Sequence, residues 1–149
     1  MLEEFFQEVY IKFKLNFYTK IFARFETREA SLTAVETFCA ETISALGSPT
    51  INEFAQFTKI SAQNATHKVN SLVRKGYISK TQSPEDRREF RLTVTEKFLS
   101  YYNINASYVH EVAGRMADRF TKDELDAFGR VLQIISTELM PEISLGGRE

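Results

Sequence analysis

Three residues, Lys59–Ser61, separate two short stretches of helical hydrophobic pattern, residues 51–58 and 62–74. So short a connection keeps two helices in contact, and we therefore expect the two stretches to cross closely. Ala55 is small enough to lie at such a crossing, and the Ser61 hydroxyl can cap the second helix. This feature constrains the fold most strongly, because it predicts a helix-turn-helix unit near the middle of the chain.

The hydrophobic period changes directly after this unit. Residues 90–95, Phe-Arg-Leu-Thr-Val-Thr, alternate between apolar and polar side chains, which is typical of a half-buried strand. Residues 77–81 can pair with this strand in the antiparallel sense. The eight polar residues between the two strands, 82–89, are too many for a tight turn. The sequence therefore predicts a protruding hairpin with a charged tip.

Helix starts are marked by Thr-x-x-Glu patterns that fit a capping box, in which hydroxyl and carboxylate each accept from a backbone N–H group. These patterns begin at Thr33, Thr50 and Thr121. Periodicity also predicts a helix over residues 2–25 and one long helix from Thr95 to about Phe120.

The expected fold is mainly α with a small β-hairpin wing. A winged helix-turn-helix lobe would span residues 31–95, and a helical dimerisation region would combine residues 1–30 and 96–149.

The first helix carries apolar side chains on two sides of its axis. Phe5 and Val9 mark one side, and Leu15 and Phe22 mark the other. A helix with two apolar sides has to be covered on both. One cover is its own domain, and we expect the other to be a second subunit. The final helix, residues 122–139, has a seam-like apolar stripe of the kind found between paired helices.

Charge is unevenly distributed along the chain. The net charge is −1, but residues 59–91 contain eight basic and three acidic side chains, so this segment carries +5 and the remainder −6. A basic segment within an acidic protein is typical of a module that faces phosphates. A solvated charged surface would give the same count, so charge alone leaves both interpretations open.

The second helix of the central pair has a polar side that lacks acids. Its inner side is expected to consist of Ala65, Val69 and Leu72. The outward side chains are Gln63, His67, Asn70 and Arg74, flanked by Asn64, Thr66 and Ser71. An ordinary solvated helix usually carries Glu–Lys pairs, whereas amides, hydroxyls and an imidazole suit hydrogen bonding to base edges in a major groove.

Several stretches of the sequence resemble the MarR family of bacterial transcriptional regulators. They are Leu32-Thr33, Thr50–Ala55, Ile60–Thr66, Leu72–Ile78, Pro84–Arg88 and Leu92-Thr93. The most specific piece is the Asp-x-Arg pattern of the wing, here Asp86-Arg87-Arg88, followed by the Leu-Thr strand end. The order of helices before and after also matches, so the resemblance covers nearly the whole chain. It implies a winged helix-turn-helix protein that binds double-stranded DNA as a homodimer.

The resemblance also implies roles for individual residues. Major-groove contacts would come from Gln63, Asn64, Thr66 and His67, and phosphate contacts from Lys68, Arg74 and Lys75. Arg88, next to Arg87, would enter the minor groove from the wing tip. Asp86 would brace the wing by pairing with a nearby arginine. A symmetric dimer would place two recognition helices about one helical turn apart on a near-palindromic operator.

Members of this family commonly respond to small aromatic or lipophilic ligands, so the resemblance implies a ligand-responsive regulator, and we expect a repressor. Aromatic residues available for an effector pocket are Phe13, Phe17, Phe38 and Tyr102. Aromatic side chains at helical spacing are more often simply part of the core, so a purely structural role stays open for all four.

Other functions are weighed against DNA binding. A winged-helix protein-interaction module without DNA binding would have no use for the basic Arg87-Arg88 tip. A thiol-based redox sensor would use Cys39, but its apolar neighbours favour an inert buried thiol. The sequence contains no Gly-rich phosphate loop and no cluster of His and Cys residues that could hold a metal. No other feature of the sequence supports a Ser–His–Asp catalytic triad. We therefore expect no enzymatic activity, no cofactor and no metal.

The sequence also predicts a cytoplasmic protein that contacts no membrane. Its longest run without Asp, Glu, Lys or Arg is 98–110, well short of the ~20 apolar residues of a membrane helix. Charged residues from Glu3 to Lys14 interrupt any apolar core of a signal peptide. A single cysteine suits a reducing compartment.

Overall fold

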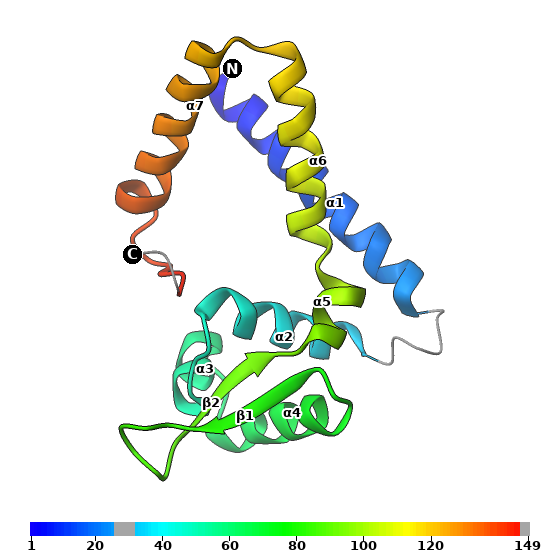
Figure 1. The fold of residues 1–149 in the computed structure, drawn as a ribbon, viewed down its shortest axis with the longest axis vertical. Coiled ribbons are helices and arrows are strands. Elements are labelled where there is room, and N and C mark those ends of the chain that lie inside the picture. The colour runs from blue at the N-terminus through cyan, green and yellow to red at the C-terminus, as the bar shows by residue number, and fades with distance from the viewer. Residues whose placement is uncertain (26–31, 147–149) are drawn as a thin grey trace. The chain divides into compact units, whose positions relative to one another are not determined.

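The computed structural model describes residues 1–25 and 32–146 (Figure 1). Its helices are α1 (Leu2–Phe25), α2 (Ala34–Leu46), α3 (Ile51–Thr58), α4 (Ala62–Arg74), α5 (Glu96–Tyr102), α6 (Ile104–Arg119) and α7 (Lys122–Ile134), and α7 continues into a π-helical turn, η1 (Ile135–Leu139). The strands β1 (Ile78–Gln82) and β2 (Phe90–Val94) pair in the antiparallel sense. The predicted fold class, mainly α with a β-hairpin wing, is confirmed.

The threonines that precede α2, α3 and α7 cap these helices. The full capping box forms at Thr33 and at Thr121. At Thr50 only half of the predicted box forms. The Thr50 hydroxyl accepts from the Glu53 N–H at 3.1 Å, but the Glu53 carboxylate lies 3.9 Å from the Arg91 guanidinium on β2. The carboxylate pairs with the guanidinium instead of the Thr50 N–H, and for this reason the prediction of a complete box is wrong.

The segment after Thr95 also differs from the prediction of one long helix. The structure has two helices, α5 and α6, which are separated at Asn103. Asn103 has φ −76° and ψ 51°, so its backbone leaves the helical region. Asparagine favours such breaks because its side chain competes for backbone hydrogen bonds. A one-residue interruption barely disturbs the hydrophobic period, and the sequence pattern therefore does not reveal it.

The hairpin is attached to the helix-turn-helix unit through its second strand, β2. In the β1–β2 register Lys80 lies opposite Leu92, and Gln82 lies opposite Phe90. The Leu92 N–H donates to the Pro49 carbonyl at 2.8 Å, and Thr50 forms an isolated bridge with Arg91. The segment that begins α3 therefore also fixes the position of β2.

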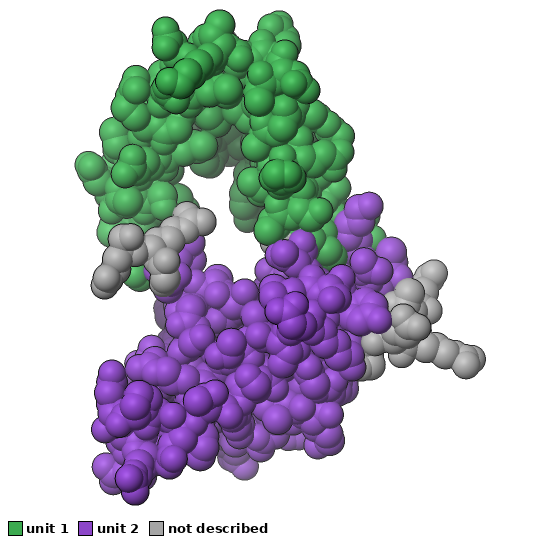
Figure 2. All heavy atoms as spheres, in the orientation of Figure 1, with its two compact units in different colours: residues 1–19, 104–144 green, residues 20–103, 145–149 purple. Residues whose placement is uncertain are grey.

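Two compact units make up the described chain (Figure 2). Unit 1 comprises residues 1–19 and 104–144, and unit 2 comprises the described parts of 20–103 and 145–149. The large side chains that are fully buried belong to unit 2: Ile43, Phe54, Val69, Leu72, Tyr77, Ile78, Leu92, Phe98 and Tyr102. Burying each apolar side chain of this size contributes about 1.5–3 kcal/mol. The core of unit 2 thus supports α4 and the hairpin from behind.

Unit 1 leaves many apolar side chains uncovered in the single chain. On α1, Phe5 is 60% exposed and Val9 54%. On α7, Val131 and Leu132 are also exposed. Within the unit, the Phe13 ring meets Tyr108 edge-on with 5.3 Å between centroids. The division into a dimerisation region, residues 1–30 and 96–149, and a DNA-binding lobe stays a prediction.

Candidate nucleic-acid interface

The helix-turn-helix forms as the sequence predicts. Phe54 and Ala55 of α3 are buried, and α4 packs through Ala65, Val69 and Leu72, which are all fully buried. The Ser61 hydroxyl accepts from the Asn64 N–H at 3.1 Å and so caps α4. Between the helices Lys59 adopts a left-handed conformation with φ 58°. These contacts fix which side of α4 faces outward.

The outward side of α4 carries the predicted polar residues. Exposed side chains are Gln63, Asn64, His67, Asn70 and Arg74, whereas Thr66 and Lys68 are half-buried. The Thr66 hydroxyl donates to the Ala62 carbonyl at 2.8 Å, so it offers a partner an acceptor oxygen and a methyl group. Within Ala62–Arg74 there is no carboxylate to repel a phosphate backbone. This surface is rich in donors and carries net positive charge.

One residue of this surface is held by the wing. The Lys80 ammonium, from the middle of β1, donates to Asn70 Oδ1 at 2.8 Å. The sequence marks Lys80 only as a basic residue of the predicted hairpin, and strand alternation does not show that its side chain meets α4. The contact joins the helix surface to the hairpin.

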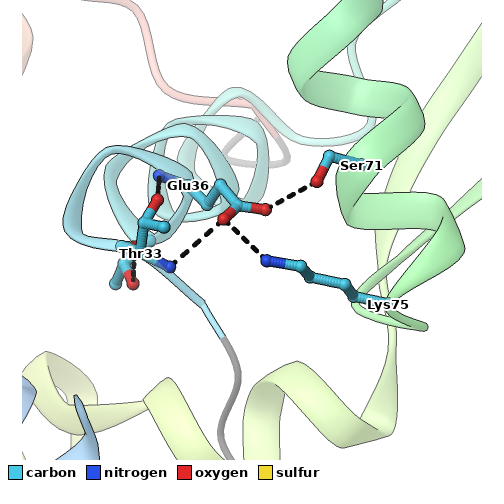
Figure 3. A network of polar contacts seen from close by, with 5 residues as sticks. Thr33, Glu36, Ser71 and Lys75 are labelled. Carbon is cyan, nitrogen blue, oxygen red and sulfur yellow. Dashed lines mark hydrogen bonds and ion pairs between the residues drawn. The ribbon is translucent and has the colours of Figure 1, made fainter.

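The carboxyl-terminal end of α4 is tied to α2 by a buried carboxylate, Glu36 (Figure 3). Glu36 Oε1 accepts from Lys75 Nζ at 2.8 Å and from the Thr33 N–H at 3.2 Å, and Oε2 accepts from the Ser71 hydroxyl at 2.9 Å. Burial alone would raise the pKa of Glu36, but the bonds from Lys75, Ser71 and Thr33 outweigh burial and hold the pKa below its usual value. The Lys75 ammonium is engaged by Glu36, and its predicted phosphate contact stays a prediction.

The wing tip is held by hydrogen bonds within the hairpin. The Ser83 N–H donates to the Glu89 carbonyl at 2.9 Å, and Gln82 Nε2 donates to the Arg87 carbonyl at 2.8 Å. Asp86 Oδ1 accepts from the Arg88 N–H at 2.9 Å and from Arg88 Nε at 3.3 Å. Asp86 thus pairs with the arginine that follows it in the tip. The Arg88 side chain is nevertheless 91% exposed, so its guanidinium remains open to a partner.

Arg91 is a further basic residue whose role the sequence analysis missed. Its guanidinium lies 3.9 Å from the Glu53 carboxylate and 3.6 Å from that of Glu85, and it donates to the Ser48 carbonyl at 3.3 Å. These contacts join α3, β2 and the wing tip. Strand alternation alone could not show that Arg91 faces the helices.

The residues considered for an effector pocket lie in different units. Phe13 and Phe17 belong to unit 1, and Phe38 and Tyr102 belong to unit 2. Tyr102 is fully buried, stacks on Phe98 and meets Tyr77 edge-on, and burial raises its pKa to about 12. Its ring is therefore occupied by core packing. Phe38 is exposed on α2, and an effector role for these residues stays a prediction.

Cys39 has the environment of an inert thiol. Its side chain is buried in α2, and burial raises its pKa, which lowers the reactive thiolate fraction. This environment does not favour the alternative of a redox sensor based on Cys39.

In residues 1–25 and 32–146, no helix is long and apolar enough to cross a membrane.

Comparison with known proteins finds a likeness in the winged helix-turn-helix segment. Residues 32–90 match the model of the MarR family. The match lies on the helix-turn-helix and the start of the wing and shows a likeness to this family over that segment. A relative in Bacillus subtilis, the uncharacterised HTH-type transcriptional regulator YpoP, is 36% identical over 64 residues, which cover 41% of this chain and 45% of YpoP. The aligned part thus spans less than half of that relative.

Solved structures show the same fold over nearly the full length of the chain. Streptococcus pneumoniae FabT in complex with DNA is similar with a TM-score of 0.62 and 18% identity, covering 95% of this chain and 97% of FabT. A mutant of S. aureus MepR bound to an oligodeoxyribonucleotide is similar with a TM-score of 0.52 and 14% identity, covering 94% and 99%. The likeness to these two structures is one of fold.

Proposed function

We propose that this protein is a MarR-family regulator of transcription that binds specific sequences of double-stranded DNA. The observation that carries the proposal is the exposed, acid-free side of α4 beside a wing tip with Arg87 and Arg88. Amide and imidazole groups on a helix suit base edges in a major groove, and an exposed arginine on a wing suits the minor groove. The DNA complexes of similarly folded proteins support this assignment.

The active form in this proposal is a homodimer. The uncovered apolar side chains of α1 and α7 would pack against a second copy, since a single chain rarely leaves so much apolar surface in water. Two-fold symmetry would then present two α4 helices to half-sites about one helical turn apart. The operator would accordingly be close to palindromic.

The regulatory part of the proposal is repression that a small aromatic or lipophilic effector relieves. Such an effector would favour a dimer arrangement whose α4 spacing no longer matches successive major grooves. In vitro transcription from the promoter upstream of the protein's own gene tests the regulatory role. We expect added protein to lower the amount of transcript. A larger amount of transcript would mean that the protein regulates this promoter as an activator. An unchanged amount of transcript would contradict regulation at this promoter.

Lys68→Ala is expected to weaken binding to all duplexes by a similar factor. Lys68 lies half-buried on α4, where its ammonium can approach a phosphate rather than a base edge. Loss of one phosphate contact should lower the slope of log affinity against log salt by about one. Fluorescence anisotropy at several salt concentrations measures this slope. Lys20→Ala, which removes an exposed lysine from α1, is the control and should leave it unchanged. A loss confined to one duplex would contradict the phosphate role.

Introducing carboxylates at Phe5 and Val9 together (Phe5→Glu, Val9→Glu) is expected to dissociate the dimer. Both side chains are exposed apolar groups of α1, and burying two charges in an apolar interface without partners is strongly unfavourable. Sedimentation equilibrium should give the mass of two chains for the wild type and of one chain for the variant. Gln133→Glu, on the polar side of α7, is the matched control and should remain dimeric. A variant that keeps the dimer mass would place the interface elsewhere.

A further inference from the structure

The contact between Lys80 and Asn70 joins the middle of β1 to the DNA-facing side of α4. Lys80 Nζ donates to Asn70 Oδ1 at 2.8 Å. Lys80 is half-buried, whereas Asn70 is exposed. Asn70 lies on the same side of α4 as Gln63 and His67, so it belongs to the surface that the proposed function assigns to DNA. Lys80 therefore contacts that surface from the first strand of the wing.

The chemistry of the contact fixes the orientation of the Asn70 amide. A lysine ammonium has hydrogen-bond donors and no acceptor, so only the amide oxygen can face it. The amide NH2 group must then point away from Lys80. Asn70 consequently offers an outside partner two N–H donors, while its oxygen lies against a positive charge.

This orientation changes which base an asparagine can recognise. Asparagine usually reads adenine, because its oxygen accepts from the adenine amino group while its NH2 donates to N7. With Lys80 at the oxygen, an adenine amino group would meet a positive charge. Guanine presents two acceptors, O6 and N7, to the major groove. We propose that Lys80 is a specificity-determining residue, which holds Asn70 as a donor so that Asn70 selects guanine over adenine. This inference rests on the proposed function.

Selection of bound duplexes from a pool with randomised positions tests the inference. The wild type and Asn70→Ala are compared first, and the base pair whose preference disappears in the variant is the one that Asn70 reads. We expect guanine there, preferred over adenine by about 5- to 100-fold, as for a well-placed pair of hydrogen bonds. Lys80→Met keeps the length of the side chain but removes the donors, and it should shift the preference toward adenine. Lys80→Arg keeps donors without an acceptor and should retain guanine.

A second variant tests the same point without altering β1. Asn70→Asp keeps an acceptor for Lys80 but has no NH2 group, so the guanine preference should disappear. Guanine selection by this variant would overturn the inference. So would adenine selection by the wild type, or a uniform loss of affinity in Asn70→Ala, which would mean a phosphate contact. Those results would leave DNA binding itself intact. Failure of the wild type to bind any duplex at low salt would instead remove the proposed function together with the inference.

Discussion

Replacing Glu36 by alanine is expected to lower the free energy of unfolding by about 2 kcal/mol. The substitution removes the shared acceptor of Lys75, Ser71 and Thr33, so a half-buried hydroxyl and a half-buried ammonium lose a hydrogen bond (Figure 3). Urea denaturation measures the effect as a lower midpoint with an unchanged slope.

Glu53→Ala is the matched control for this prediction. Glu53 occupies the equivalent position after a threonine cap, but its side chain is exposed and contributes one long ion pair, 3.9 Å from Arg91. Its removal should lower the free energy of unfolding by about 0.5–1 kcal/mol or less, as for other surface ion pairs. Equal losses in the two variants would contradict a structural role for the Glu36 network.

The Glu36 network should also have a pH signature. In the folded protein the bonds from Lys75, Ser71 and Thr33 outweigh burial and lower the pKa of Glu36. A carboxyl whose pKa is lower in the folded state stabilises the fold above its unfolded pKa, and this stabilisation is lost as the pH falls through the folded value. Glu36→Gln cannot titrate. The difference in unfolding free energy between wild type and Glu36→Gln should therefore be largest near neutral pH and shrink below about pH 4. A constant difference would contradict the ionised network.

Arg88→Ala is expected to weaken operator binding by about 5- to 150-fold, equivalent to roughly 1–3 kcal/mol. Arg88 lies at the wing tip. Asp86 pairs with its guanidinium and orients the side chain, which stays largely exposed. Its loss should also relax the preference for A·T-rich flanks, where a narrow minor groove attracts a guanidinium. Anisotropy titrations at fixed salt, on duplexes with A·T-rich and G·C-rich flanks, measure both effects.

Arg130→Ala is the control for Arg88→Ala, because it removes an exposed arginine from the polar side of α7. This variant should bind the operator as the wild type does. If Arg88→Ala also binds unchanged at matched salt, the wing tip does not enter the groove.

Sequence patterns predicted those parts of the fold that depend on neighbouring residues. The Thr33 capping box, the Ser61 cap and the buried side of α4 are all set by spacings of three or four residues. These local preferences agree with the final packing. The outward side of α4 follows from the same periodicity, and most of the candidate interface could be predicted.

Contacts between elements distant in sequence could not be predicted. Glu36 and Lys75 are 39 residues apart, and a carboxylate in α2 carries no local mark of its partner. The sequence therefore does not show that Lys75 pairs with Glu36, and the capping pattern at Thr50 does not show that Glu53 turns toward Arg91. The break at Asn103 was hidden because one non-helical residue hardly shifts the apolar stripe. Tertiary ion pairs and single-residue breaks are the features that periodicity does not encode.

The central claim, that α4 and the wing form a dimeric interface for specific DNA, is tested most directly by one titration. Fluorescence anisotropy would follow binding to the DNA upstream of the protein's own gene and to a scrambled duplex at several salt concentrations. We expect a clear preference for the upstream DNA, two chains per site and an affinity that falls steeply with salt. Absence of binding to either duplex at low salt would contradict the claim.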